Sequence, residues 1–112
     1  MLGHEKLDVY RCGIEFLALA SKQLDAFPRG NAGLADQLRR ASLSMPLNIA
    51  ESVGSRGAGE RRRFLSIARG SAMECGAILD VCRVLGLMEE ETVVEGKELL
   101  VRIVSMLTKM TV

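Results

Sequence analysis

The sequence predicts an all-α protein, an antiparallel up-down-up-down four-helix bundle in which all 112 residues (1–112) form one domain. Hydrophobic residues make up 48% of the chain and aromatic residues only 4%, so aliphatic side chains must fill the core, as between packed helices. Two prolines and no long Gly/Ser tract argue against disorder and against a multi-strand sandwich. Apolar residues recur at three- and four-residue spacing in four segments, expected as helices over about 4–27, 32–54, 58–86 and 89–111.

The first expected helix, residues 4–27, carries two neighbouring rows of apolar side chains. One row contains Leu7, Tyr10, Ile14, Leu17 and Leu24, and the other contains Val9, Gly13, Phe16 and Ala20. Together they form a face wide enough for neighbouring helices on two sides. Pro28 and Gly30 then end the helix and turn the chain. His4, the only histidine, lies at the start of this segment and is expected to be solvated.

The second expected helix, residues 32–54, contains a proline in its middle. Its inward residues are expected to be Leu34, Leu38, Ala41, Met45, Ile49 and Val53. Pro46 removes a backbone hydrogen bond and clashes with the carbonyl one turn earlier, so we expect a kink here or a break just before it. Asn48 and Glu51 follow one turn apart, and if buried they must be hydrogen-bonded, for example to groups that Pro46 leaves unpaired. A polar network that fixes helix geometry is favoured over a catalytic use.

The third and fourth helices have regular inner rows. The row of the third contains Leu65, Ala68, Ala72, Cys75, Leu79 and Cys82, and that of the fourth contains Val93, Leu99, Leu100, Ile103, Met106, Leu107 and Met110. Gly70 and Ser71 belong to a run of small residues that permits a neighbouring helix to approach closely. Gly86 is expected to end the third helix, and acidic residues 89–91 open the fourth, where they favour the positive end of the helix dipole.

The number and spacing of the cysteines indicate their redox state and their role in the core. Three cysteines without a secretory signal suggest reduced thiols, and Cys75 and Cys82 lie about 10.5 Å apart along one helix, too far to bridge. We interpret them as small apolar fillers of the core rather than reactive thiols.

No apolar run could span a membrane, so a cytoplasmic location is expected. The mean hydropathy of +0.17 is high for a small soluble protein and favours an oligomer that covers an exposed apolar stripe.

Positive charge is concentrated between residues 39 and 71. This stretch holds seven arginines and two glutamates, a charge of +5 in a chain whose formal net charge is +1. The candidate phosphate-binding residues are Arg39, Arg40, Arg56, Arg61, Arg62 and Arg63. Guanidinium groups and the free N–H groups at the start of the third helix could bind phosphate together. The alternative is a solvated cap on the bundle, although an oligomer would repeat the arginines into a multivalent basic surface.

Motifs for catalysis are absent from the sequence. The segment GSRGAG at residues 54–59 has the glycines of a phosphate loop but neither the following Lys-Ser/Thr nor a preceding strand. A single histidine cannot supply the two Glu-x-x-His pairs of a di-iron bundle, nor a base for the serines and cysteines. We therefore expect a protein that is not an enzyme and that holds no metal and no cofactor.

Three segments resemble a known family: Gln37–Ala41 (QLRRA), Ser44–Glu51 (SMPLNIAE) and Arg63–Glu74 (RFLSIARGSAME). The resemblance, which extends to His4–Tyr10 and to the Phe27-Pro28 turn, is to the S23 proteins, four-helix bundles encoded in intervening sequences of bacterial 23S ribosomal RNA genes. Ser52 stands where such proteins usually carry glycine. The family is similar to the accessory variability determinant of diversity-generating retroelements. The resemblance implies a homopentamer with a central channel, a nucleic-acid-binding accessory role and a reverse transcriptase as a possible partner.

Two functions of different class follow. The first is a non-enzymatic homo-oligomer that binds RNA or DNA phosphates with weak sequence specificity, since Phe64, the one aromatic residue among the arginines, fits the core. The second is an oligomeric scaffold that binds another protein through an acidic or apolar face. Phosphate binding must weaken steeply as salt rises, whereas an apolar interface should not. A third interpretation, a bundle that binds a small molecule or a metal, lacks ligands.

Overall fold

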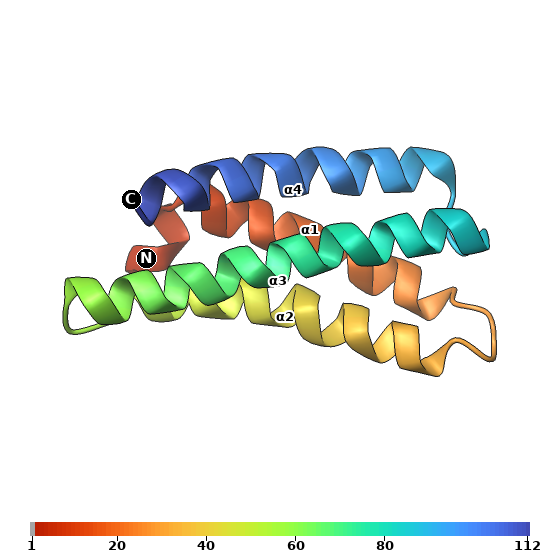
Figure 1. The fold of residues 1–112 in the computed structure, drawn as a ribbon, viewed down its shortest axis with the longest axis horizontal. Helices are drawn as coiled ribbons and strands as arrows, with labels where there is room; N and C mark the ends of the chain where they lie inside the picture. The colour runs from red at the N-terminus through yellow and green to blue at the C-terminus, as the bar shows by residue number, and fades with distance from the viewer. Residues whose placement is uncertain (1) are drawn as a thin grey trace.

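The computed structural model describes residues 2–112, and the helices of this part of the chain confirm the all-α prediction (Figure 1). A short 3₁₀-helix, Gly3–Lys6, precedes four α-helices. These are α1 (Asp8–Asp25), α2 (Ala32–Val53), α3 (Ala58–Leu85) and α4 (Glu90–Met110). None of the helices within residues 2–112 combines the length and apolar content needed to cross a bilayer.

The first helix differs from its expected range, 4–27. Leu7 adopts an extended conformation (φ −82°, ψ 128°) that separates the 3₁₀-helix from α1, and α1 ends at Asp25. The expected second helix, 32–54, corresponds to α2, which ends one residue earlier. At the end of α3, Gly86 has a left-handed φ of 69°, and the Leu87 N–H donates to the Cys82 carbonyl at 2.8 Å, a glycine helix end.

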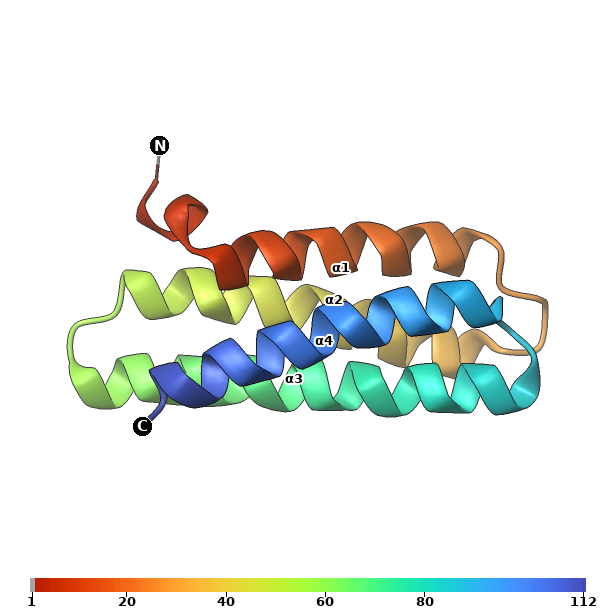
Figure 2. The same ribbon diagram turned by 90° about the horizontal axis from the view of Figure 1, so that it is seen from above.

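Each helix packs against two others, so the core lies between all four. Helix α1 contacts α2 and α4, and α3 contacts the same two helices from the other side. The α1–α2 and α3–α4 connections lie at one end of the molecule, and the α2–α3 connection and the C-terminus lie at the other (Figures 1 and 2). The molecule is accordingly elongated, with extents of 44 × 26 × 22 Å.

The two apolar rows of α1 are buried to different extents. Val9, Gly13, Phe16 and Ala20 are buried, whereas Ile14 of the other row is 40% exposed. The reason is a close contact with α2, because a Cβ on Gly13 would lie 3.5 Å from the Pro46 Cβ. Gly13 thus lies in van der Waals contact with Pro46, and its row is the one that faces α2.

Helix α2 continues through Pro46 without a break, and Pro46 is buried. The break expected before the proline therefore does not occur. Val53, expected inward, is 45% exposed, and Ser52 is buried in its place. The Ser52 hydroxyl donates to the Ile49 carbonyl at 2.6 Å, which satisfies a polar group that burial would otherwise penalise.

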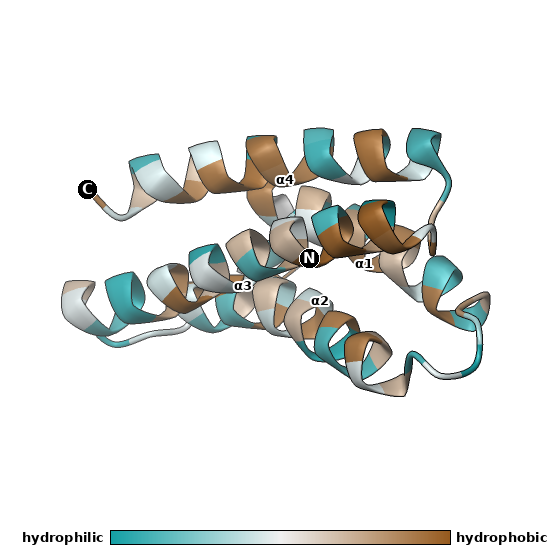
Figure 3. Cartoon of the chain, turned by 45° about the vertical axis from the view of Figure 1, so that its right-hand side comes forward, coloured by the Kyte–Doolittle hydropathy of each residue, from teal (hydrophilic) through white to brown (hydrophobic). Residues whose placement is uncertain are grey.

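The inner row expected for α3 is confirmed, since all six of its residues are buried. In α4 the residues Val93, Leu99, Leu100, Ile103 and Leu107 are buried, while Met106 and Met110 pack at the edge of the core and are half-buried. Hydrophobic and hydrophilic segments alternate along each helix (Figure 3), as amphipathic helices require.

The tightest glycine position in the core is Gly96 of α4, which does not belong to the run of small residues expected to allow a close approach. A Cβ there would lie 2.8 Å from Leu79 Cδ1 and 3.4 Å from Phe16 Cε1. Gly70, by contrast, is exposed, and a Cβ added to it would meet nothing within 4 Å. The close approach expected at Gly70 is thus found at Gly96 instead.

We predict opposite effects for substitutions at these two glycines. Gly96→Val should destabilise the fold by about 1–3 kcal/mol, because the added methyl groups overpack Leu79 and Phe16. Gly70→Ala should stabilise it by about 0.5–1 kcal/mol, because alanine loses less entropy in a helix interior. Urea denaturation followed by circular dichroism measures both. A Gly96→Val protein as stable as the parent would contradict the close approach.

Candidate nucleic-acid interface

Four of the six candidate arginines lie together at one end of the bundle. Arg56 belongs to the connection between α2 and α3, and Arg61, Arg62 and Arg63 lie in the first two turns of α3. All four side chains belong to exposed residues. We call this group the arginine end.

The charges of the arginine end are not neutralised locally. Among the ion pairs of residues 2–112, none involves Arg56, Arg61, Arg62 or Arg63. Glu60 is the only acidic residue between positions 56 and 63, so this segment carries a charge of +3. Four unpaired guanidinium groups at one end of a helical bundle provide a positive potential directed at solvent.

The start of α3 adds backbone donors to this end. Gly57 precedes the helix in an extended conformation, and no side chain caps it. The first intrahelical hydrogen bond runs from the Arg61 N–H to the Gly57 carbonyl at 3.0 Å. The earlier N–H groups of α3 have no acceptor within the helix, as at any helix start, and they point in the same direction as the positive end of the helix dipole.

Arg39 and Arg40 lie elsewhere. They belong to the first half of α2, and fourteen residues separate Arg39 from the end of that helix, about 21 Å at 1.5 Å per residue. Arg39 also forms a 2.8 Å ion pair with Asp36. The structure therefore divides the six candidate residues into a cluster of four and a distant pair.

Phe64 differs from its expected place in the core. It is half-buried and does not belong to the core cluster of buried residues. The Arg63 guanidinium carbon lies 5.7 Å from the centre of the Phe64 ring, within the range of a cation–π contact. An aromatic ring partly open to solvent beside arginines is a surface on which an unpaired base can stack.

A polar network joins α2 to α3 near Pro46. The Asn48 amide donates to the Ser44 carbonyl at 2.8 Å and to the Ser44 hydroxyl at 3.1 Å. The Ser71 hydroxyl of α3 donates to the same Ser44 hydroxyl at 2.9 Å. Asn48 thus donates to Ser44, one helical turn earlier. Pro46 has no N–H to donate to the Ser42 carbonyl, and Asn48 does not donate to that carbonyl in its place. Glu51 is exposed and lies outside this network.

We predict that Asn48→Ala lowers the free energy of unfolding by about 1 kcal/mol, because it removes the donor to both Ser44 acceptors. Gln37→Ala, on the same helix at an exposed position, is the control and should leave stability within about 0.5 kcal/mol. Thermal unfolding compares the two. Equal transition temperatures for both variants would contradict the structural role of the network.

The three cysteines are buried, free thiols, in agreement with their interpretation as core residues. Burial, with a smaller contribution from the charge of Glu74, raises the pKa of Cys75 from 9.0 to about 12. Burial also raises the pKa of Cys82. Both thiols therefore keep their protons at neutral pH, and the thiolate needed for nucleophilic chemistry is disfavoured.

The raised pKa of Cys75 predicts a loss of stability at high pH. Above pH 9.0 the unfolded chain releases this proton while the folded protein holds it up to about pH 12, so stability falls in that window. The loss should reach about 1.4 kcal/mol per pH unit for one thiol. Urea denaturation of the parent and of Cys75→Ala on both sides of pH 9.0 isolates the effect, because all other titrations are shared. Parallel stability curves would refute it.

His4 is half-buried and meets Tyr10 edge-on, with 4.7 Å between ring centres, so it is not the solvated residue expected from the sequence. No group of three or more His, Cys, Asp or Glu side chains suited to a metal ion occurs within residues 2–112.

These features define a small helical protein with an exposed cationic end. The model of the 23S rRNA-intervening sequence protein family matches residues 5–109, nearly the whole chain, and the protein belongs to that family. The resemblance drawn from the sequence segments is thereby confirmed. The sequence matches no curated protein.

Proposed function

We propose that this protein is a non-enzymatic accessory protein that binds RNA or DNA through the phosphate backbone. The observation that carries the proposal is the arginine end, with four exposed guanidinium groups and, within residues 2–112, no ion pair to neutralise them. Phosphate contacts of this kind depend on charge and not on base identity, so weak sequence specificity is expected. Membership of a family named for ribosomal RNA intervening sequences is consistent with such a partner.

The proposal includes an up-down-up-down bundle that assembles into a homopentamer in the cytoplasm. Connections at alternating ends of the molecule in Figures 1 and 2 support the topology. Exposed apolar residues that lie side by side on α3 and α4, among them Met73, Val94 and Val101, support assembly, because a contiguous apolar surface marks an interaction site. Five copies would present twenty guanidinium groups of the arginine end on one particle. Many weak phosphate contacts made at once would then give a useful affinity, although the net charge of one chain is low.

Charge at the two ends of the bundle supports binding at one end only. Glu89, Glu90 and Glu91 lie at the α3–α4 connection, opposite the arginine end (Figure 1). Glu90 is paired with Arg83, so Glu89 and Glu91 supply the excess negative charge at this end, and the formal charge of +1 is the sum over a basic and a weakly acidic end. In a ring with rotational symmetry, every subunit directs the same end to the same side, so the arginine ends would gather on one face.

The second candidate is an oligomeric scaffold for another protein, such as a reverse transcriptase, without nucleic-acid binding. The observation in its favour is the exposed apolar surface on α3 and α4, which includes Met73, Val94 and Val101. Salt separates the two functions, since only phosphate binding involves release of counterions.

We predict that a labelled single-stranded RNA binds at 50 mM salt and loses about 50-fold in affinity at 200 mM, as four phosphate contacts require. Reversing the charges of Arg61, Arg62 and Arg63 to Glu should abolish binding and leave helix content unchanged. Fluorescence anisotropy and circular dichroism measure the two effects.

The matched control reverses Arg39 and Arg40, which lie about 21 Å from the end of α2. This double variant should bind more weakly than the parent but far more tightly than the triple variant. If the triple variant bound RNA like the parent, the arginine end would not be the site. Binding that is insensitive to salt, or absent at 50 mM, would favour the scaffold.

A further inference from the structure

A groove open to solvent runs between α3 and α4, with a volume of about 430 Å³. Of its lining residues, Ala72 and Leu100 are buried, Gly76 is half-buried, and Met73 and Val101 are exposed and form its rim. A Cβ on Gly76 would lie 3.9 Å from Leu100 Cδ1, an ordinary van der Waals contact. The absence of a side chain at Gly76 therefore leaves space in the groove, although the packing does not require a glycine there. We call this feature the α3–α4 groove.

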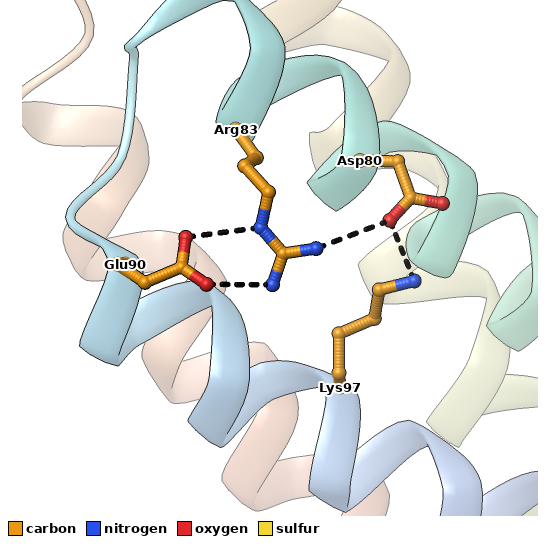
Figure 4. Close-up of polar contacts among 4 residues, drawn as sticks. All are labelled: Asp80, Arg83, Glu90 and Lys97. Carbon is orange, nitrogen blue, oxygen red and sulfur yellow. Dashed lines mark hydrogen bonds and ion pairs between the residues drawn. The ribbon is translucent and has the colours of Figure 1, made fainter.

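The charges at the groove are already paired with one another. Lys97 Nζ lies 2.7 Å from Asp80 Oδ1, and among the residues that the structure describes these two are the only charged ones that line the groove. Beside them, Arg83 contacts Glu90 at 3.0 Å and Asp80 at 4.0 Å, and Figure 4 shows the four side chains as one network. No net charge is left to attract phosphate, so the groove suits an apolar occupant.

An apolar ridge with a matching spacing of side chains lies on α2. Leu43 and Leu47 are 42% and 60% exposed, and they point away from the core, which α2 contacts through Leu38, Met45 and Ile49. The two leucines lie one turn apart, about 6 Å along the helix. Ala72 and Gly76 in the floor of the groove have the same separation along α3, so two large side chains of one helix match two small positions of another.

One chain cannot bring these two features together. Helix α2 contacts α1 and α3 but not α4, and its leucine ridge faces outward, so the ridge and the groove belong to different faces of the same bundle. Each is uncovered in the single chain, and a single type of contact between two copies covers both. Because the two surfaces are unlike, the contact is heterologous and can repeat around a closed ring.

We propose that the Leu43–Leu47 ridge of one subunit docks into the α3–α4 groove of the next. This assignment rests on the proposed homo-oligomer and names the surfaces that would form it. A ring with an odd number of subunits requires such a head-to-tail contact, since two-fold contacts pair subunits and leave one unmatched. The arginine end lies outside both surfaces and stays open to nucleic acid.

The test uses one variant for each surface. Leu47→Glu places a charge on the ridge, and Val101→Glu places one on the rim of the groove; each should convert the assembled parent to a monomer of 12.2 kDa. Mixed together, the two variants should form a 1:1 heterodimer of twice that mass and no larger particle. One intact ridge then meets one intact groove, while the remaining ridge and groove are both defective. Light scattering after size-exclusion chromatography measures the masses.

Leu85→Glu is the control, because Leu85 is exposed on α3 but belongs to neither surface, and it should keep the mass of the parent. Circular dichroism checks that each variant is folded. If Val101→Glu fails to fold, Ala77→Trp fills the groove without adding a charge and replaces it in the mixture. A monomeric parent, variants that keep the parent mass, or a mixture that stays monomeric would each overturn the proposed docking.

RNA binding at low salt, measured on the same samples, separates this inference from the proposed function. An assembled parent that binds RNA while both variants keep its mass would refute the docking and leave the nucleic-acid function standing. A parent that binds no RNA while the two variants form the heterodimer would support the docking and refute nucleic-acid binding. The monomeric variants should still bind RNA, more weakly than the parent, because they lose the multiplication of sites.

Discussion

The packing of four helices around a core with almost no aromatic side chains is the constraint on which the rest of the structure depends. Aliphatic side chains reach only a short distance, so the helices must approach closely to exclude water. They do so where one residue is small, at Gly13 against Pro46 and at Gly96 against Leu79 and Phe16. These contacts set the rotation of α1 and α4, and that rotation decides which of their residues are buried and which face solvent.

The sequence predicted the fold class and most helix ends because the signals are local. Gly86 and the Pro28–Gly30 turn mark connections, and a single apolar row identifies the buried face of α3 without ambiguity. Helix α1 has two apolar rows of similar strength, and the choice between them depends on a contact with Pro46, more than thirty residues away. Such a contact produces no periodicity in the sequence, so the sequence alone did not show which of the two rows is the more deeply buried.

The candidate site was predictable only as far as its members are neighbours in the chain. Arg61, Arg62 and Arg63 are consecutive at a helix start, and Arg56 lies in the preceding connection, so a common location follows from the sequence. Arg39 is close in sequence number but lies far along α2 and is paired with Asp36. The position of Phe64 depended on the rotation of α3 near its first turns, where the apolar row has only begun.

The separation of arginines and glutamates to opposite ends also affects how the protein approaches a charged partner. A body about 44 Å long with cations at one end and carboxylates at the other has a large electric dipole moment. The field of a polyanion exerts a torque on this dipole before any contact forms, at separations within the Debye length of about 10 Å at 0.1 M salt. For the nucleic-acid partner proposed above, this torque would turn the bundle with its arginines forward during diffusion, and a larger fraction of collisions would begin in a productive orientation.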